Sequence, residues 1–490
     1  MLRFCEALSF PKPVKHQLAG TEDRPIRATP GPNLRRIRIY TRPAKVSAPP
    51  TLHEASMKSL LPLLLATSAL ATENRDAIFQ KSIHSMFPKL VEIRRDIHSH
   101  PELPNEEVRT SKLVADRLKE LGFTDIKTGV AKTGVVALLQ GGQDGPCVAV
   151  RADMDALPIK ELRSAPYRSQ NPGVMHACGH DVHTTCALGV AELLSKHRDL
   201  VKGSVKFIFQ PAEEAMPATF KGDWGAKLMV AEGVMENPKP AAIFGLHTTA
   251  QVMPAGVTDD SVHYLKAGQI GYTPGIDNAN SDRFHIVIKG KMAHGSTPHK
   301  GVDAIAVAAE AIMALQMIKS RQTNTRQPLV ISIGVIKGGD RENIIAEQVE
   351  MGGTVRTYDA NFRDGIIAQM HRILKGITEA HGAGYEMEYR KTYPSIQNDV
   401  KLIEATLPAF RRICGQKNVI ELIPGMGGED FSYFAQIVPG FYFRLGVANE
   451  EKGFIHGGHT PMYDCDEESI KTGVAAMAAA VCDFLDSAAK

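Results

Sequence analysis

Aromatic residues are scarce in this chain, and its single tryptophan is Trp224. Proteins that hold single-stranded nucleic acid stack its bases on aromatic side chains, and this composition leaves little material for such platforms. Basic charge is also scarce outside the start of the chain: residues 1–56 carry ten Lys and Arg against four Asp and Glu, whereas the remainder is mildly acidic. We therefore expect no nucleic acid as a partner.

Long hydrophobic runs are missing as well. The leucine-rich stretch 60–65 is far shorter than the roughly 20 apolar residues that a membrane-spanning helix needs, so we expect no membrane span. A short basic start at Met57, this apolar stretch and an A-x-A site at 69–71 are together typical of a secretory signal peptide over residues 57–71.

The signal peptide predicts that translation begins at Met57 and that a secreted or periplasmic mature chain starts near Thr72. Residues 1–71 would then be a non-structural leader. Residues 1–56 are rich in Pro and Arg and have no sustained apolar period, which is typical of disorder. The alternative is that they are translated as an Arg-rich organelle transit sequence.

Cysteines are too few and too scattered for a disulfide-stapled scaffold. Domains of this size fold without disulfides. One cysteine, Cys178, lies within a cluster of histidines and needs its own explanation. The six cysteines beyond residue 71 are Cys147, Cys178, Cys186, Cys414, Cys465 and Cys482.

The length of 490 residues exceeds one compact core, so two domains are expected. Short apolar runs bounded by Gly and Pro predict buried strands, and helical stretches separate them. The alternation predicts an α/β fold with a mixed, largely parallel sheet, which binds ligands at the carboxyl ends of its strands. Strands are predicted at 135–139, 148–150, 205–209 and 241–246, and helices after Phe87 and at 183–196, 400–412 and 470–485.

The pattern of apolar and polar residues changes near Ser281. Phe284, Ile286 and Ile288 alternate with more polar residues, which predicts a half-buried strand. The elements that follow give the order β-α-β-β-α-β of a ferredoxin-like domain. We place this lid domain at 279–392, inserted into a catalytic domain formed by 77–278 and 393–490. Its elements are predicted at 284–289, 302–322, 329–336, 349–357, 361–382 and 385–390.

The densest group of chemically active side chains lies at 175–185. Cys178, His180 and Asp181 fall within four residues around a glycine, and a thiolate, an imidazole and a carboxylate so placed can close on a metal ion. The alternative is a His-rich helix N-terminus with Asp181 as its cap. The motif alone leaves both interpretations open, because no standard zinc spacing is present.

Three further sites strengthen the metal hypothesis. A buried strand at 205–209 ends in Glu213 and Glu214, and two adjacent carboxylates there would be costly without a cation. Because neighbouring side chains of extended backbone point apart, one can hold metal while the other faces a metal-bound water. His247 directly follows another apolar strand, and a Gly-flanked pair, His456 and His459, lies near the C-terminus.

Together these motifs resemble the M20 metallopeptidase family from about His98 to the C-terminus. The amidohydrolase branch, with aminoacylases, hippurate hydrolase and auxin-conjugate hydrolases, is the most similar. The resemblance implies a two-domain α/β enzyme that hydrolyses the amide bond of N-acyl amino acids. The motifs that carry it lie at 175–185, 210–214, 245–247 and 459–461, with further signatures at 151–158, 293–299 and 353–357.

The resemblance also implies a set of metal ligands. Two divalent ions would be held per subunit, with Cys178 as the bridge and Glu213 as the catalytic carboxylate. His459 is preferred over His456 because it precedes a residue and then Pro461, as in the family motif. The five implied ligands are Cys178, His180, Glu214, His247 and His459.

Further roles follow from the same resemblance. Asp155 would orient a ligand histidine. His294 would be a catalytic lid histidine that contacts the substrate carbonyl in the partner subunit's active site, which implies a homodimer formed through the lid. Asn343 and Arg356 are candidates for binding the substrate carboxylate, although a plain salt bridge between strands would equally explain Arg356.

The expected mechanism is attack of a metal-activated water with Glu213 as general base. Thiolate and imidazole ligands favour Zn²⁺, and mixed sites also take Mn²⁺, Ni²⁺ or Co²⁺. The first alternative is a metallo-carboxypeptidase or dipeptidase that acts on short peptides. A non-catalytic metal- or peptide-binding protein and a thiol hydrolase with Cys178 as nucleophile and His180 as base are the others.

Overall fold

The structure, a computed structural model, describes residues 52–214, 216, 220–250 and 264–488. The chain divides into two compact units, Met1–Leu65 and Ala66–Lys490. Most of the predicted disordered segment, residues 1–51, lies outside the described residues. Within the described part of the chain, every helix is too short or too polar to cross a membrane.

Helix α1 (Leu52–Ser99) begins well before the position that the sequence predicted. The expected start after Phe87 was wrong, and so was the disorder expected for residues 52–56. Phe79, Ile83, Leu90 and Ile97 are all buried, and their spacing of three to four residues per turn places them on one helix face. This apolar stripe was readable from the sequence and marks the helix as part of the fold.

The second unit is built around an eight-stranded sheet in the order β1-β2-β4-β3-β5-β16-β6-β15. Its centre is parallel, because β4 pairs with β3, β3 with β5 and β5 with β16 in parallel. The predicted α/β class with a mixed, largely parallel sheet is therefore confirmed. The strands are β1 (Asp125–Val130), β2 (Gly134–Gln140), β3 (Gln143–Asp153), β4 (Lys202–Gln210), β5 (Ile243–Thr249), β6 (Ile270–Tyr272), β15 (Val419–Glu421) and β16 (Gly440–Gly446).

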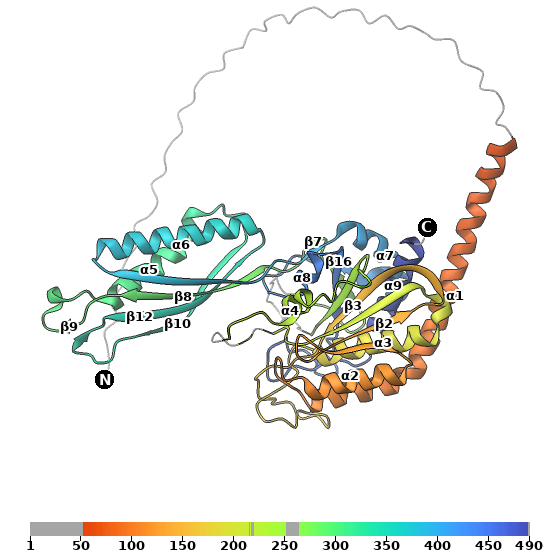
Figure 1. The fold of residues 1–490 in the computed structure, drawn as a ribbon, viewed down its shortest axis with the longest axis horizontal. Helices are drawn as coiled ribbons and strands as arrows, with labels where there is room; N and C mark the ends of the chain where they lie inside the picture. Colours follow the sequence, from red (N-terminus) through yellow and green to blue (C-terminus); the bar gives the residue numbers. More distant parts are fainter. Residues whose placement is uncertain (1–51, 215, 217–219, 251–263, 489–490) are drawn as a thin grey trace, which may run out of the picture. The chain divides into compact units, whose positions relative to one another are not determined.

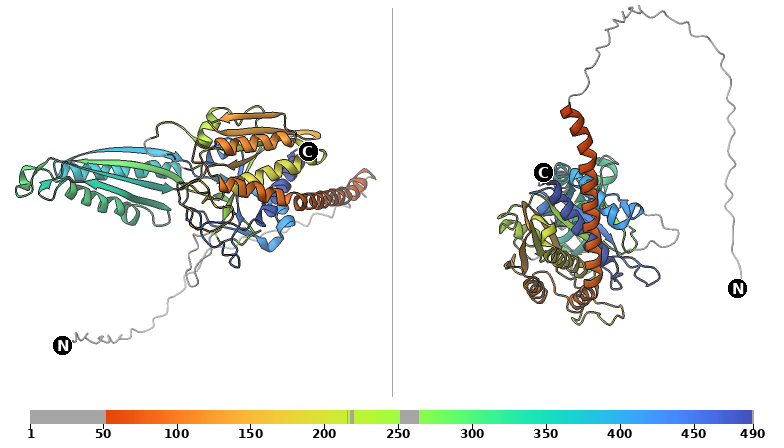
Figure 2. Two further views of the ribbon diagram at one scale, coloured as in Figure 1. Left: turned by 90° about the horizontal axis from the view of Figure 1, so that it is seen from below. Right: turned by 90° about the vertical axis from the view of Figure 1, so that its right-hand side faces the viewer.

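Helices cover both faces of this sheet (Figures 1 and 2). Phe207 and Phe209 of β4 point into the core on one face, and Ile208 between them points into the core on the other. This is why the central strands read as continuous apolar runs. The helices are α2 (Val108–Glu120), α3 (His180–Lys196), α4 (Gly225–Ala231), α7 (Val400–Cys414), α8 (Ser432–Ala435) and α9 (Ser469–Ala488).

Strand β1 escaped prediction. It lies at the edge of the sheet and pairs only with β2 among the described strands. None of its six residues is fully buried, so no apolar alternation marks it. Edge strands of this kind carry little hydrophobic signal in their sequence.

Residues 280–393 form a second, four-stranded antiparallel sheet in the order β10-β12-β8-β13. Phe284, Ile286 and Ile288 face a separate hydrophobic core beneath α5 and α6, as the alternation predicted. The two helices lie on one side of this sheet (Figure 1). The chain order is β8 (Asn280–Lys289), α5 (Ala304–Met317), β10 (Leu329–Gly338), β12 (Gln348–Thr357), α6 (Ala360–Ala380) and β13 (Gly384–Tyr393).

The chain enters and leaves this second sheet at one place. Strands β7 (Gly275–Ile276) and β14 (Gln397–Asn398) pair with each other on either side of it. An insertion into the larger α/β body produces this arrangement, because both connections must start from the same point. The use of the inserted part as a lid stays a prediction.

Candidate metal centre

The loop that carries Cys178 and His180 is fixed by a glycine between them. Gly179 has a φ of 94° and is the N-cap of α3. A Cβ atom at this position would lie 2.1 Å from Thr248 Oγ1 and 2.4 Å from Tyr463 Oη. Only glycine fits this backbone and this space, and the turn directs Cys178 and His180 into one site.

Glu213 and Glu214 follow the end of β4 in a turn that Asp155 holds. The Asp155 carboxylate accepts hydrogen bonds from the backbone N–H groups of Glu213, at 3.0 Å, and Glu214, at 2.9 Å. The same carboxylate lies 3.2 Å from Nδ1 of His180. Asp155 therefore connects the acidic pair with the Cys-His loop.

His247 at the end of β5 is oriented by its own strand. Its Nδ1 donates to the Thr248 carbonyl at 2.7 Å, and its Nε2 lies 3.3 Å from Sγ of Cys178. Burial and the nearby His183 and Arg444 hold the pKa of His247 well below its ordinary value. A neutral imidazole with one nitrogen fixed by a carbonyl is the usual form of a metal-binding histidine.

His459 reaches the same place from the C-terminal loop. It has a φ of 62°, and its backbone N–H donates to the Ala177 carbonyl at 2.7 Å. Its Nε2 lies 3.1 Å from Glu214 Oε1, and hydrogen bonds to Cys178 and Glu214 raise its pKa to about 10. His456 does not belong to this group of side chains.

The five side chains form two groups that share one sulfur. The donor atoms of Cys178, His180 and His247 all lie within 4.8 Å of one another, and so do those of Cys178, Glu214 and His459. Nε2 of the buried His180 has no hydrogen-bond partner among the described residues, whereas its Nδ1 faces Asp155. A buried ring nitrogen without a partner is costly, and sulfur, nitrogen and carboxylate donors together suit divalent cations such as Zn²⁺. The residues present therefore fit two cations with a shared thiolate.

His183, which belongs to the same motif, has a different place. Its Nδ1 lies 2.6 Å from Asp153 Oδ1, and its Nε2 accepts from the Thr248 backbone N–H at 2.8 Å. Burial lowers its pKa, which agrees with a neutral ring that donates on one side and accepts on the other. His183 therefore supports the strand that carries His247.

Glu213 lies beside the two groups, and its donor oxygen is within 4.8 Å of those of His180 and Glu214. Burial raises the pKa of Glu213 well above its ordinary value, and the charges of Glu429 and Glu214 act in the same direction. A buried carboxyl with a raised pKa takes up protons readily near neutral pH.

Sequence reasoning missed the buried ionic group beneath Glu213. The guanidinium of Arg151 bonds to Asp153 at 2.7 Å and to Glu429 and Asp430 at 3.0 Å. Tyr442 also donates to Glu429. The adjacent acidic pair at 429–430, preceded by two glycines, resembles the pair at 213–214 and was the available signal.

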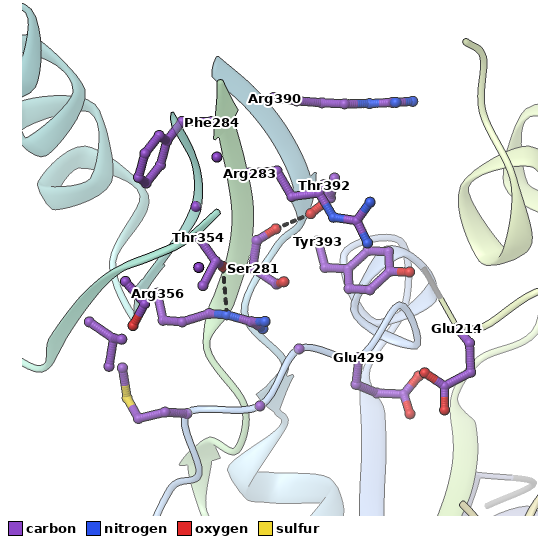
Figure 3. A pocket seen from close by; sticks show the side chains of 18 of the residues that line it. Glu214, Ser281, Arg283, Phe284, Thr354, Arg356, Arg390, Thr392, Tyr393 and Glu429 are labelled. Atoms are coloured by element: carbon purple, nitrogen blue, oxygen red, sulfur yellow. Dashed lines mark hydrogen bonds between the residues drawn. The ribbon is translucent and has the colours of Figure 1, made fainter. Parts of the chain in front are cut away.

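Most of the proposed metal ligands lie on a cavity of about 1220 Å³. Cys178, Glu213, His247 and His459 lie on its wall, and residues of β8, β10, β12 and β13 line other parts of it. Figure 3 shows Arg356 and Arg283 reaching into this cavity from their strands, with Glu214 and Glu429 across from them.

Arg356 lines the cavity as a free cation. Its Nε donates to Thr354 Oγ1 at 3.1 Å, and it forms no ion pair with any residue that the structure describes. Burial lowers its pKa. Of the two interpretations of Arg356, the geometry favours a binding group over a salt bridge between strands.

His294 and Asn343 lie outside this cavity. His294 in β9 (Ala293–His294) pairs with β11 (Ile344–Ile345), and Gly295 N–H donates to the Asn343 carbonyl at 2.7 Å. Both side chains are exposed. The structure thus places them next to each other, on a two-stranded ribbon beyond the end of β8 that is distant from Ser281.

The sequence matches the model of peptidase family M20/M25/M40 over residues 149–483. The chain belongs to this family. N-acetylcysteine deacetylase of Bacillus subtilis is 38% identical over 390 residues, 80% of this chain and 94% of that protein. Thermostable carboxypeptidase 2 of Saccharolobus solfataricus is 40% identical over 391 residues, 79% of this chain and 93% of that protein.

One solved structure bears directly on the metal centre. The Bacillus subtilis YXEP protein, described as a dinuclear metal binding peptidase of the M20 family, is 34% identical. The match has a TM-score of 0.67 and covers 82% of this chain and 99% of that one. The geometry of the site thus agrees with membership of a peptidase family and with the dinuclear metal binding described for this relative.

Proposed function

We propose that this protein is a metal-dependent amidohydrolase that cleaves the amide bond of N-acyl amino acids. The observation that carries the proposal is the convergence of two donor groups on Cys178. Cys178, His180 and His247 would hold one cation, and Cys178, Glu214 and His459 the other. Asp155 would orient His180 and the Glu213–Glu214 turn.

When bound, the cations polarise the amide carbonyl and lower the pKa of a bound water from about 15.7 to about 7. Glu213 then accepts the proton of the attacking water and returns it to the departing amine. Its burial and raised pKa suit it to hold this proton between the two steps. Glu213 is only 6% exposed and lines the cavity, so its carboxylate can meet a water there while little of it faces bulk solvent.

The Glu213→Gln variant tests this assignment. Glutamine keeps the size of the side chain and cannot accept the proton, so we expect metal content near that of the wild type and a loss of turnover of at least 100-fold. Metal content is measured on the purified chain, and turnover with an N-acetyl amino acid. A variant that keeps near-normal turnover would refute Glu213 as the base.

The substrate class follows from the charges that line the cavity. Arg356, free of ion pairs among the described residues, would bind the carboxylate of the amino-acid part through its planar guanidinium. The relative named N-acetylcysteine deacetylase supports an acyl amino acid. The named carboxypeptidase relative supports the second candidate, a metallo-carboxypeptidase on short peptides. Rates on N-acetyl, N-benzoyl and indole-acetyl amino acids against dipeptides separate the two.

Zn²⁺ or Mn²⁺ is the proposed metal, and Ni²⁺ or Co²⁺ would also fit. A thiolate with three imidazoles favours Zn²⁺, whereas the Glu214 carboxylate also suits Mn²⁺. Reloading the metal-free chain with each ion and comparing turnover identifies the functional metal. Equal turnover with every ion would contradict a selective site.

We also propose a homodimer that forms through residues 280–393. Ser281 at one end of β8 lines the cavity, and His294 follows its other end, roughly 30 Å away at about 3.4 Å per residue. His294 therefore cannot reach the Ser281 end of the cavity in its own chain, and this is the end where Tyr393 contacts Glu213. Edge strand β10 and helix α5 also expose Ile336 and Met313, which a second subunit would cover.

Mixing two inactive variants tests this dimer. A subunit with His294→Ala and one with Glu213→Gln together form one site that has both groups intact. We expect the mixture to regain about a quarter of wild-type activity once subunits have exchanged randomly. About half of the dimers are then heterodimers, and one of the two sites in each heterodimer is intact. A mixture that forms heterodimers and stays inactive would refute the contribution of His294 across the interface.

Secretion or periplasmic export remains part of the proposal. Residues 57–71 support it through their signal-peptide pattern, and Thr72 would be the first residue of the exported chain. Expression from Met57 in an export-competent host followed by N-terminal sequencing tests both statements. Recovery only of uncleaved protein inside the cell would contradict them.

A further inference from the structure

Arg94 is a buried cation that the proposed mechanism does not use. It lies on α1 and has no exposed surface. Its Nε lies 2.8 Å from Asp181 Oδ2, and its Nη2 donates to Asp464 Oδ1 at 2.7 Å. The guanidinium also stacks on Tyr167, 4.9 Å from the ring centroid.

Two of the three carboxylates that Arg94 contacts belong to the two loops that carry the proposed ligands, and the third is Glu467, 3.4 Å away. Asp181 directly follows His180 at the start of α3. Asp464 lies in the segment that follows His459. One side chain therefore ties the loop of Cys178 and His180 to the loop of His459.

The bonds around Arg94 make this connection rigid. Asp181 also contacts His98 Nδ1 at 2.8 Å, and Asp464 accepts from Tyr167 Oη at 2.9 Å. Next to Asp464, Tyr463 Oη lies 2.9 Å from Thr248 Oγ1, beside His247. Three segments that carry ligands thus meet in one buried network, in which a bidentate guanidinium has few ways to move.

We propose that Arg94 is a positioning residue that sets the spacing of the two ligand loops and thereby the affinity of the chain for both cations. The inference rests on the proposed metal centre. Partners that hold metal ligands in place typically change metal affinity by 10–100-fold when they are replaced. A lysine at position 94 keeps the positive charge but has a single ammonium group in place of the planar guanidinium group. It therefore cannot bind the carboxylates of both loops at once.

Arg75 offers a matched control on the same helix. It is 5% exposed and also joins two carboxylates, Asp483 and Asp486. Both of those belong to α9, which carries none of the proposed ligands. Arg75→Lys therefore removes a comparable buried guanidinium group that does not contact the ligand loops.

The experiment is a Co²⁺ titration of the metal-free wild type, Arg94→Lys and Arg75→Lys, followed by the thiolate-to-cobalt absorption band and by calorimetry. We expect the wild type to bind two ions, Arg94→Lys to bind them 10–100-fold more weakly with an altered band, and Arg75→Lys to match the wild type. Melting temperatures of the metal-free proteins show how much each substitution destabilises the fold.

Two results would overturn the inference alone: wild-type affinity and band in Arg94→Lys, or an equal loss in Arg75→Lys. A wild type that binds no Co²⁺ would instead overturn the metal centre, and this inference with it. Should Arg94→Lys fail to fold, Asp464→Asn takes its place, because it weakens the link to the His459 loop only. We then expect one of the two ions to bind more weakly, and two unchanged constants would refute the link.

Discussion

Replacing Asp155 by asparagine removes one of the connections on which the metal centre depends. The carboxylate accepts two backbone N–H bonds, from Glu213 and Glu214, and faces Nδ1 of His180. Asparagine offers one oxygen, so one of the two N–H groups is left without an acceptor and meets an NH₂ group. A buried donor left unpaired costs about 1–3 kcal/mol.

The same substitution loosens His180. Loss of a carboxylate partner of a ligand histidine weakens metal binding by about 10–100-fold, or roughly 1.4–2.8 kcal/mol. Calorimetric titration of the metal-free chain with Zn²⁺ measures this loss, and thermal unfolding measures the loss of stability. Asp144→Asn is the control, because Asp144 is exposed and lies on β3, the strand that Asp155 follows. Metal affinity within twofold of the wild type in Asp155→Asn would refute this role.

Three further predictions concern the surroundings of the site. Burial and the charge of Asp155 raise the pKa of Glu107 from 4.5 to about 7. Between these two pH values the folded state keeps a proton on Glu107 that the unfolded state releases. The free energy of unfolding therefore falls as pH rises from about 4.5 to about 7. Glu107→Gln should therefore raise the melting temperature of the metal-free chain at pH 8 and leave it nearly unchanged at pH 4, and equal effects at both pH values would contradict this. Tyr393 donates to the Glu213 carbonyl at 2.7 Å, so Tyr393→Phe should lower kcat by about 2–12-fold, for a bond worth about 0.5–1.5 kcal/mol; an unchanged kcat would show that this bond does not position Glu213. Chelation by EDTA should abolish turnover and added Zn²⁺ or Mn²⁺ should restore it, whereas activity that survives chelation would favour the thiol mechanism at Cys178.

The sequence was sufficient to predict the parts of the site that follow strand ends. His247 and the Glu213–Glu214 pair each follow an apolar run, and in a parallel sheet such ends meet at one edge. The structure brings both together with Cys178. Local pattern and sheet geometry thus carried this part of the prediction.

Pairs that are distant in the sequence escaped prediction. Arg151 and Glu429 are 278 residues apart, and Arg94 and Asp464 are 370 apart. Each of these residues alone has the appearance of an ordinary surface charge, and only folding shows that they are buried together. His294 was found by its motif and Asn343 by the family resemblance, but their distance from the Ser281 end of the cavity follows only from the length of β8.

A crystal structure of the metal-loaded chain, with diffraction data collected on both sides of the absorption edge of the metal, tests the central claim most directly. The account predicts two metal peaks that share one sulfur, with Cys178 Sγ about 2.3 Å from each if the metal is zinc. His180 and His247 should contact one peak, and Glu214 and His459 the other. A single peak, or peaks that do not touch Cys178, would contradict the account.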